Sequence, residues 1–341
     1  MLIALGLLVI VLASWAMTGW LRRYALARDV LDIPNARSSH RLPTPRGGGV
    51  AIVISSALAF AVLGALGGLS REVCWALLGS GLLVAVVGFA DDHRPLAARW
   101  RLLVHFLAAA WGLLFMGGMP SLSLFGGEVL PAWLLCGLGL VYLVWLLNLY
   151  NFMDGIDGIA AVEAITVCSG GALLYVLLGH AGLAQVPMIL ALACAGFLFW
   201  NFPAARIFMG DAGSGYLGIM LGLFSLQAGW VEPQLFWAWL ILLGVFMVDA
   251  SVTLLHRLMR GERVYLAHRS HAYQYASRRY GRHWPVTLAV AVINLIWLLP
   301  LAIWVAYGAN GPLVTLLAYA PLIMLALWFK AGQAEPALQQ E

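Results

Sequence analysis

Acidic and amide side chains gather where two long apolar stretches of this chain meet. The stretch from Asn148 to Gly158 reads Asn-Leu-Tyr-Asn-Phe-Met-Asp-Gly-Ile-Asp-Gly, in a chain that is 63% hydrophobic and 10% charged. Charged groups at a membrane border have a low free-energy cost only where water, a partner or a metal compensates them. We therefore interpret this stretch as part of a catalytic site on one aqueous side of a membrane.

Five aspartates are predicted to lie on that same side, namely Asp91, Asp92, Asp154, Asp157 and Asp211. Clustered carboxylates repel one another, and a proton or a cation relieves the repulsion. Hard oxygen ligands, without a cysteine pair or a paired-histidine set beside them, favour Mg²⁺ or Mn²⁺ over zinc. The alternative, that these residues are solvated loop ends, stays open most of all for the adjacent Asp91 and Asp92.

Three glycine-containing segments directly precede or open predicted helices, at 154–158, 209–215 and 43–49. Glycine lets the backbone approach a ligand closely, and the free N–H groups at a helix start favour phosphate. For the segment 43–49, which contains Arg46, a Pro/Gly hinge entering the membrane is an equal alternative.

The last polar loop contains His268, Arg269 and His271, with aromatic residues between its basic ones. Such a loop can clamp a diphosphate and stack a base, although a basic loop without chemistry is the alternative. The spacing of the two histidines lacks the further ligands of a zinc site. Asp249 lies within an apolar stretch, which makes it a functional candidate, but its position alone assigns it no role.

The 341-residue chain has a mean hydropathy of +0.91, which predicts a single all-α, polytopic membrane domain over 1–341. Since a span needs roughly 20 apolar residues, we expect eleven transmembrane helices. They are placed at about 1–20, 48–68, 73–90, 102–118, 131–149, 159–179, 186–202, 214–231, 234–255, 285–307 and 312–329. The tail 331–341 is expected to be disordered.

The basic residues predict the orientation in the membrane. Of the 19 Lys and Arg residues, all but Arg71 fall in the tail or in the same alternating set of loops. That set is 21–47, 91–101, 150–158, 203–213 and 256–284. The positive-inside rule makes these loops cytoplasmic, with the N-terminus outside and the C-terminus inside. We expect these loops to form the active site.

The order of the motifs resembles that of the polyprenyl-phosphate N-acetylhexosamine-1-phosphate transferases, the polytopic phosphoglycosyl transferases of glycosyltransferase family 4. The matching features are Asp91-Asp92, the run Asn148-x-x-Asn151-x-x-Asp154-Gly-Ile-Asp157-Gly, Phe208 to Ser214, and the histidine-containing loop. The resemblance extends from Pro43 to about Gly281 and is most specific in the middle two motifs. Where many members read His-x-His-His, this chain reads His271-Ala272-Tyr273-Gln274.

The resemblance implies transfer of a sugar-1-phosphate from a UDP-N-acetyl sugar to undecaprenyl phosphate, with release of UMP. It implies Mg²⁺ or Mn²⁺ and a site on the cytoplasmic face of a bacterial inner membrane, in O-antigen or cell-envelope polysaccharide synthesis. Asp211 and Asn151 then resemble the metal ligands, and Asp91, Asp92, Asp154 and Asp157 the catalytic residues. Asn148, Asn151, Arg46, His268, Arg269 and His271 are the expected substrate-binding residues. The resemblance leaves the donor sugar open and favours an N-acetylhexosamine or its 6-deoxy form.

The main rival function is a secondary transporter for an anionic solute. Transporters place substrate and ion groups near the membrane midplane, whereas most carboxylates here lie at one border. Asp249 is the residue that supports the rival. A membrane scaffold is a further alternative that does not require intact aspartates. We expect the lipid bilayer as surroundings and no nucleic-acid partner, and leave a homodimer open.

Overall fold

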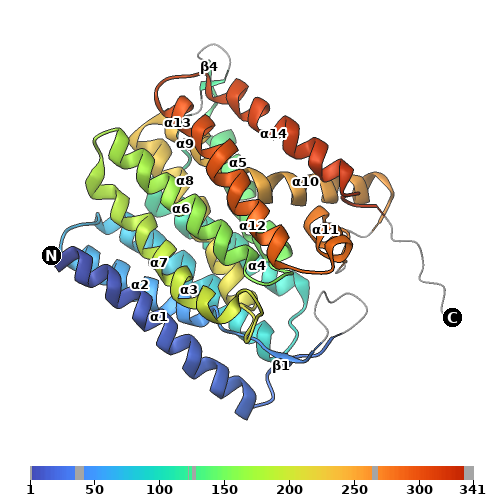
Figure 1. Cartoon of the computed structure of the whole chain (residues 1–341). Helices are drawn as coiled ribbons and strands as arrows, with labels where there is room; N and C mark the ends of the chain where they lie inside the picture. Colours follow the sequence, from blue (N-terminus) through green and yellow to red (C-terminus); the bar gives the residue numbers. More distant parts are fainter. Residues whose placement is uncertain (1, 35–41, 122, 125–127, 263–267, 334–341) are drawn as a thin grey trace.

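The computed structural model describes residues 2–34, 42–121, 123–124, 128–262 and 268–333, and these form a bundle of helices (Figure 1). Parts of the predicted loops 21–47 and 256–284, and residues 334–341 of the predicted disordered tail, lie outside the described residues. Two antiparallel pairs of very short strands are the sheet structure of the described part. They are β1 (Leu31–Asp32) with β2 (Thr44–Pro45), and β3 (Ser123–Leu124) with β4 (Glu128–Val129). The predicted all-α class is confirmed.

The helices follow the predicted apolar stretches closely. The first seven are α1 (Leu2–Ala27), α2 (Val50–Ala65), α3 (Arg71–His93), α4 (Ala98–Met116), α5 (Ala132–Met153), α6 (Ile159–Leu177) and α7 (Gln185–Asn201), with η1 (Ala181–Ala184) before α7. The remainder are α8 (Asp211–Val231), α9 (Pro233–Leu242), α10 (Gly244–Met259), α11 (Ala272–Tyr280), α12 (Trp284–Ile293), η2 (Asn294–Leu298), α13 (Leu299–Ala306) and α14 (Gly311–Trp328).

The spans are less uniform in length and straightness than the sequence predicts. Among the described residues, eight helices are long and apolar enough to cross a membrane. The predicted ninth span is a bent pair, because α9 and α10 meet at 69°, and α2 has only 16 residues. The chain is therefore a multi-pass membrane protein, while the count of eleven and the orientation stay predictions.

Helix α8 lies at the centre of the bundle. Every residue from Ala212 to Gly229 is buried, and the helix packs against α2, α3, α5 and α9. The start of α8 is reached closely by α3 at Gly88, where an added Cβ would lie 2.5 Å from the backbone nitrogen of Ala212. No side chain larger than a hydrogen fits there without a shift of the backbone. This close approach brings the acidic end of α3 to the start of α8.

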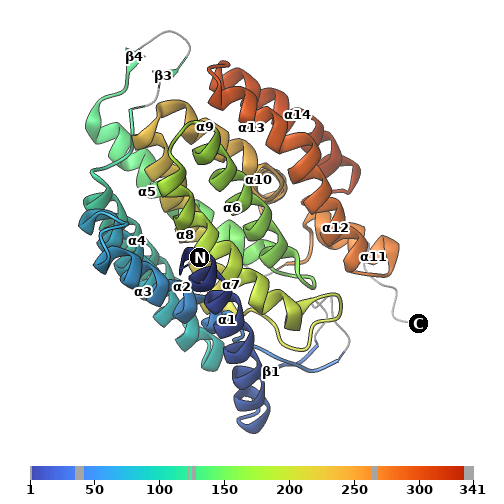
Figure 2. The same cartoon turned by 60° about the vertical axis from the view of Figure 1, so that its left-hand side comes forward.

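The two ends of the bundle differ in what they carry. Figures 1 and 2 both place β3 and β4 at one end, and β1 with α11 toward the other. The C-terminal end of α3 and the N-terminal start of α8 meet through Asp92 and Asp211. Outward side chains on the long helices are often large and apolar, for example Leu114 and Trp133, which are both 75% exposed. Such surfaces are suited to lipid contact.

Candidate active site

Asp92 joins the end of α3 to the start of α8. Its carboxylate is buried, and it accepts hydrogen bonds from the backbone N–H groups of Asp211 (3.1 Å) and Ala212 (3.3 Å). The first N–H groups of a helix have no partner within that helix, so Asp92 supplies a cap from another helix. The Arg46 guanidinium donates to the Asp92 carbonyl. Asp92 thereby fixes the backbone position of Asp211.

Asp211 lies between polar groups from two other helices. The Asn151 Nδ2 donates to its Oδ1 at 2.9 Å, and the Arg101 Nη1 lies 3.2 Å from its Oδ2. The same Arg101 nitrogen lies 2.6 Å from Oδ2 of Asp91. The other oxygen of Asp91 accepts from the backbone N–H of Leu96 at 2.5 Å. One guanidinium therefore holds two carboxylates of different helices next to each other.

Asp154 ends α5 and faces the same cluster without a partner of its own. Among the described residues, no hydrogen bond or ion pair holds its carboxylate. Burial, followed by the charges of Asp211 and Asp92, raises the pKa of Asp154 well above its usual range. A carboxyl group in this setting requires a proton or a cation.

The oxygen ligands at this cluster fit a magnesium ion. Mg²⁺ commonly binds one or two carboxylates and completes its octahedral shell with water and substrate phosphates. In the described part of the chain, no three His, Cys, Asp or Glu side chains are spaced to hold an ion by themselves. The Asn151 Nδ2 donates to Asp211 and to Ser214, which leaves its Oδ1 available beside Asp211 and the unpartnered Asp154.

A cavity of about 160 Å³ adjoins Asp211 between α3, α4, α5 and α8. Its polar lining includes Arg101, His105, Asn148 and Asn151. The Asn148 Nδ2 donates to the Val144 carbonyl at 2.7 Å and lies 3.5 Å from the His105 Nδ1. Asn148 and Asn151 therefore line the same recess as the acidic cluster, as the sequence interpretation requires.

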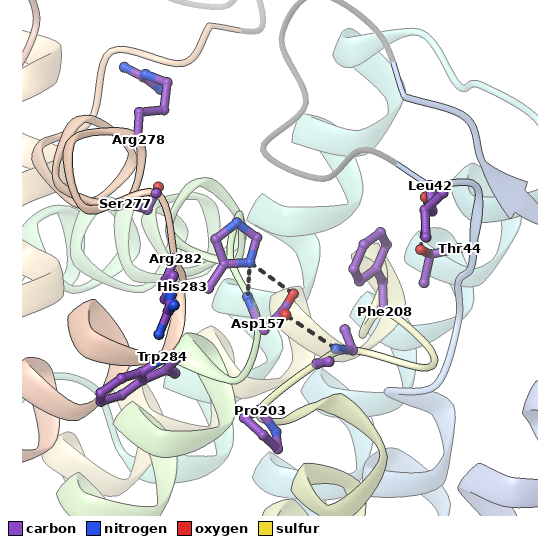
Figure 3. A pocket seen from close by; sticks show the side chains of 13 residues that line it. Leu42, Thr44, Asp157, Pro203, Phe208, Ser277, Arg278, Arg282, His283 and Trp284 are labelled. Atoms are coloured by element: carbon purple, nitrogen blue, oxygen red, sulfur yellow. Dashed lines mark hydrogen bonds and ion pairs between the residues drawn. The ribbon is translucent and has the colours of Figure 1, made fainter.

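Asp157 belongs to a second, larger cavity of about 640 Å³ (Figure 3). Its Oδ1 lies 3.1 Å from the His283 Nδ1, and its Oδ2 accepts from the Ala205 N–H at 3.2 Å. Phe208 lies across the cavity from His283 in Figure 3, and Arg282 also lines it. Asp157 thus faces a different recess from Asp154, although only two residues separate them.

The glycine segment that contains Arg46 packs against the loop before α8. The Gly48 N–H donates to the Phe208 carbonyl, and the Gly49 N–H donates to the Met209 carbonyl at 2.8 Å. The Phe208 N–H in turn donates to the Pro45 carbonyl at 2.7 Å. These amides hold two loops together, and Arg46 points to the acidic cluster through its bond to Asp92.

The last loop connects to the membrane interior through Asp249. The Asp249 Oδ1 lies 3.3 Å from the Nδ1 of His271, and both residues are buried. His268 stacks on His271 with ring centroids 4.8 Å apart. Burial, then the neighbouring His271, lowers the pKa of His268 to about 3, so His268 is neutral at physiological pH. The backbone carbonyl of Arg269 accepts a hydrogen bond from Arg278 at 3.2 Å.

Two residues that the sequence analysis did not single out line these cavities and contact their aspartates. Arg101 bridges Asp91 and Asp211, and His283 contacts Asp157. The signal for Arg101 was its place in the first turn of the helix after Asp91, where a basic side chain can turn back toward the carboxylates. His283 directly precedes a tryptophan at a span end, and no sequence pattern separated it from interfacial residues.

Comparison with known proteins connects this geometry to a family. The model of glycosyl transferase family 4 matches residues 74–229, a region that contains all five aspartates of the prediction. The chain is 31% identical over 284 residues to a decaprenyl-phosphate N-acetylglucosaminephosphotransferase of Mycolicibacterium smegmatis, covering 74% of this chain and 69% of that protein. A probable undecaprenyl-phosphate N-acetylglucosaminyl 1-phosphate transferase of Bacillus subtilis is 27% identical over 278 residues (79% and 75%). An undecaprenyl-phosphate alpha-N-acetylglucosaminyl 1-phosphate transferase of Thermotoga maritima is 26% identical over 290 residues (83% and 85%).

Proposed function

This chain belongs to glycosyl transferase family 4, and on that premise we propose that it transfers a sugar-1-phosphate from a UDP-sugar to undecaprenyl phosphate. The phosphate oxygen of the lipid takes the place of the bridging oxygen at the β-phosphorus, and UMP leaves. The names of the three relatives support the general reaction, since each acts on a polyprenyl phosphate and an N-acetylglucosamine phosphate. The reaction joins two anionic substrates, so the site must offset their repulsion.

The observation that carries the proposal is the meeting of Asp91 and Asp211 at Arg101, with Asn151 bonded to Asp211. Asp154 lies near enough for the charges of Asp211 and Asp92 to act on it. A cluster of carboxylates with one cation between them suits a site where a further cation and phosphate groups enter together. When bound, Mg²⁺ neutralises phosphate charge and polarises the phosphoryl oxygens. Asp211 and the Asn151 Oδ1 would hold it, and Mn²⁺ has the same ligand preference.

The chain's own residues have separate tasks in this proposal. Asp91 takes the proton of the acceptor phosphate, while Arg101 beside it orients that phosphate by charge. Asp92 stands beside Asp91 as the second predicted catalytic carboxylate, and its two oxygens also accept the N–H groups that begin α8. Asp154, which has no partner among the described residues, completes the wall that faces the ion. Positioning of the two substrates supplies much of the rate enhancement in phosphoryl transfer.

The cavity beside Asp157 suits the nucleotide of the donor. Its volume of about 640 Å³ lies within the range of small-molecule sites. Phe208 offers an aromatic face for a base, and Arg278 and Arg282 supply positive charge for a phosphate. The rings of His268 and His271 lie against that of Phe152, which lines the smaller cavity, and Arg278 donates to the Arg269 carbonyl. In this proposal the diphosphate of the donor lies between the two recesses.

The donor sugar is proposed to be an N-acetylhexosamine, in agreement with the names of the relatives, or a 6-deoxy form of it. The product would initiate O-antigen or another cell-envelope polysaccharide. The arginine-rich loops support a bacterial inner-membrane location with the site on the cytoplasmic face.

The test is UMP release by the purified protein in detergent, with undecaprenyl phosphate, Mg²⁺ and a panel of UDP-N-acetyl sugars. UMP that appears only with lipid and metal supports the reaction, and the donor that gives it identifies the sugar. Protein that is folded yet releases no UMP with any donor would refute the proposed function. Reactions without lipid control for simple hydrolysis of the donor.

A further inference from the structure

The buried carboxylate of Asp249 holds the start of α11. Its Oδ1 accepts from the Ala272 N–H at 3.0 Å and from the Thr253 hydroxyl at 3.1 Å, and its Oδ2 accepts from the Tyr273 N–H at 2.9 Å. The His271 Nδ1 is also 3.3 Å from Oδ1. Asp249 thus caps α11 from a neighbouring helix, just as Asp92 caps α8. The position of α11 against the membrane domain depends on this carboxylate.

Tyr273 connects the start of α11 to the turn between α5 and α6. The side chain is only 5% exposed, and its hydroxyl donates to the Phe152 carbonyl at 2.9 Å. An added Cβ at Gly155 would lie 2.2 Å from the same hydroxyl oxygen. Tyr273 therefore contacts the turn on both sides of Asp154, at Phe152 and at Gly155.

We propose that Asp249 and Tyr273 are positioning residues that hold the turn carrying Asp154. The inference rests on the proposed function, in which Asp154 faces the ion and the phosphates. The Asp154 carboxylate has no hydrogen bond or ion pair among the described residues, so its position depends on the contacts that hold the backbone of the turn. The chain of contacts runs from the Asp249 carboxylate to the Tyr273 N–H, and from the Tyr273 hydroxyl to the Phe152 carbonyl.

Tyr273→Phe removes the bond to the Phe152 carbonyl and leaves the ring in place. Because one hydrogen bond is worth a modest net free energy, we expect kcat to fall about threefold to tenfold. KM for both substrates and the thermal unfolding midpoint should stay close to wild type. Tyr275→Phe is the matched control, because Tyr275 lies on the same helix but contacts Lys330 and Phe329.

Gly155→Ala tests the same contact from the other side. The new methyl group collides with the Tyr273 hydroxyl, so we expect kcat to fall about tenfold or more. In the double variant Gly155→Ala/Tyr273→Phe the closest atom is absent, while the Tyr273 Cζ and the Gln274 Nε2 stay 3.1 Å from the new Cβ, so kcat should recover part of the loss caused by Gly155→Ala. Effects that simply multiply, or wild-type kcat in Tyr273→Phe, would overturn the proposal.

Hydrogen–deuterium exchange of residues 150–158 gives a readout that does not need activity. We expect faster exchange of this segment in Tyr273→Phe than in wild type and in Tyr275→Phe. Equal exchange in all three proteins contradicts the anchoring. If the wild-type protein releases no UMP, the proposed function fails, and the exchange experiment still decides whether Tyr273 holds the turn.

Discussion

The carboxylate of Asp92 accepts a hydrogen bond from the backbone nitrogen of Asp211 at 3.1 Å, although the two residues are 119 positions apart. Two neighbouring acidic residues, Asp91 and Asp92, therefore have different surroundings. Asp92 turns toward the start of α8, and Asp91 turns toward Arg101. Removal of a carboxylate that caps a helix and removal of a carboxylate at the proposed ion site should have different consequences. The next two predictions test this difference.

Asp92→Ala should destabilise the protein. The two N–H groups at the start of α8 lose their acceptor in a buried place, which costs about 1–3 kcal/mol for each unsatisfied group. We expect a clearly lower thermal unfolding midpoint in detergent, together with lower activity. A variant with an unchanged midpoint would contradict the capping role.

Asp211→Asn should abolish transfer and leave folding intact. The amide keeps nearly the same shape but loses the negative charge that the ion requires. We expect loss of UMP release, with normal membrane insertion and a wild-type elution profile in detergent. Asp29→Asn is the matched control, since Asp29 is exposed and has φ of 54°, which asparagine tolerates. Retained transfer by Asp211→Asn would remove Asp211 from the metal site.

The sequence predicted the fold well where hydropathy carries the information. Apolar stretches of about span length were found as helices, and Asp91, Asp92, Asp154 and Asp211 were found together because all stand at one end of such stretches. The bend between α9 and α10 was not predicted, since the residues at the break, Leu242 to Gly244, are as apolar as those around them. Hydropathy indicates which residues avoid water, but it does not indicate where a helix axis changes direction.

Other parts of the site depend on turns that a sequence pattern does not resolve. Asp154 and Asp157 were both expected among the catalytic residues, but the turn between them directs Asp157 to His283. Asp249 gained a role only when α11 was seen to begin at its carboxylate. Tyr273 and Gln274, which stand where many family members have histidines, are both buried at that contact.

Arg101→Ala should impair the reaction more than Arg101→Lys. Arg101 lies 2.6 Å from Asp91 and 3.2 Å from Asp211, and alanine leaves these two carboxylates without the cation between them. Lysine keeps the charge but offers a single nitrogen in place of the planar fork. We expect a loss of kcat of more than about a hundredfold for alanine and about tenfold for lysine. Equal losses in both variants would contradict this prediction, because they would show that the positive charge of residue 101 contributes nothing to the rate.

Removal of divalent cations should stop the reaction reversibly. EDTA should abolish UMP release, and added Mg²⁺ should restore it, because the carboxylates of Asp154 and Asp211 add to the negative charge of two phosphate substrates and a cation must offset it. Asn151→Ala removes an oxygen beside Asp211 and should raise the Mg²⁺ concentration for half-maximal rate. The control Asn310→Ala alters an exposed helix cap far along the chain, at α14. An unchanged Mg²⁺ requirement in Asn151→Ala would exclude Asn151 as a ligand.

Phe208→Ala should weaken binding of the donor nucleotide specifically. Phe208 lines the larger cavity across from His283 and Asp157, where its ring can stack on a base (Figure 3). Base–aromatic stacking contributes about 1–3 kcal/mol, so KM for the UDP-sugar should rise about tenfold or more. KM for undecaprenyl phosphate should stay unchanged, because the lipid phosphate is proposed to bind at the acidic cluster.

Inhibition by UMP distinguishes a contact to the base from a contact to the sugar. UMP lacks the sugar, so its inhibition constant should rise by the same factor as KM for the donor if Phe208 contacts the base. His283→Ala in the same cavity should also raise both constants, since Asp157 then loses the imidazole that contacts its carboxylate and the wall of the cavity loosens. If Phe208→Ala raises KM for the donor while UMP inhibits as in wild type, the cavity binds the sugar, and the nucleotide site must lie elsewhere.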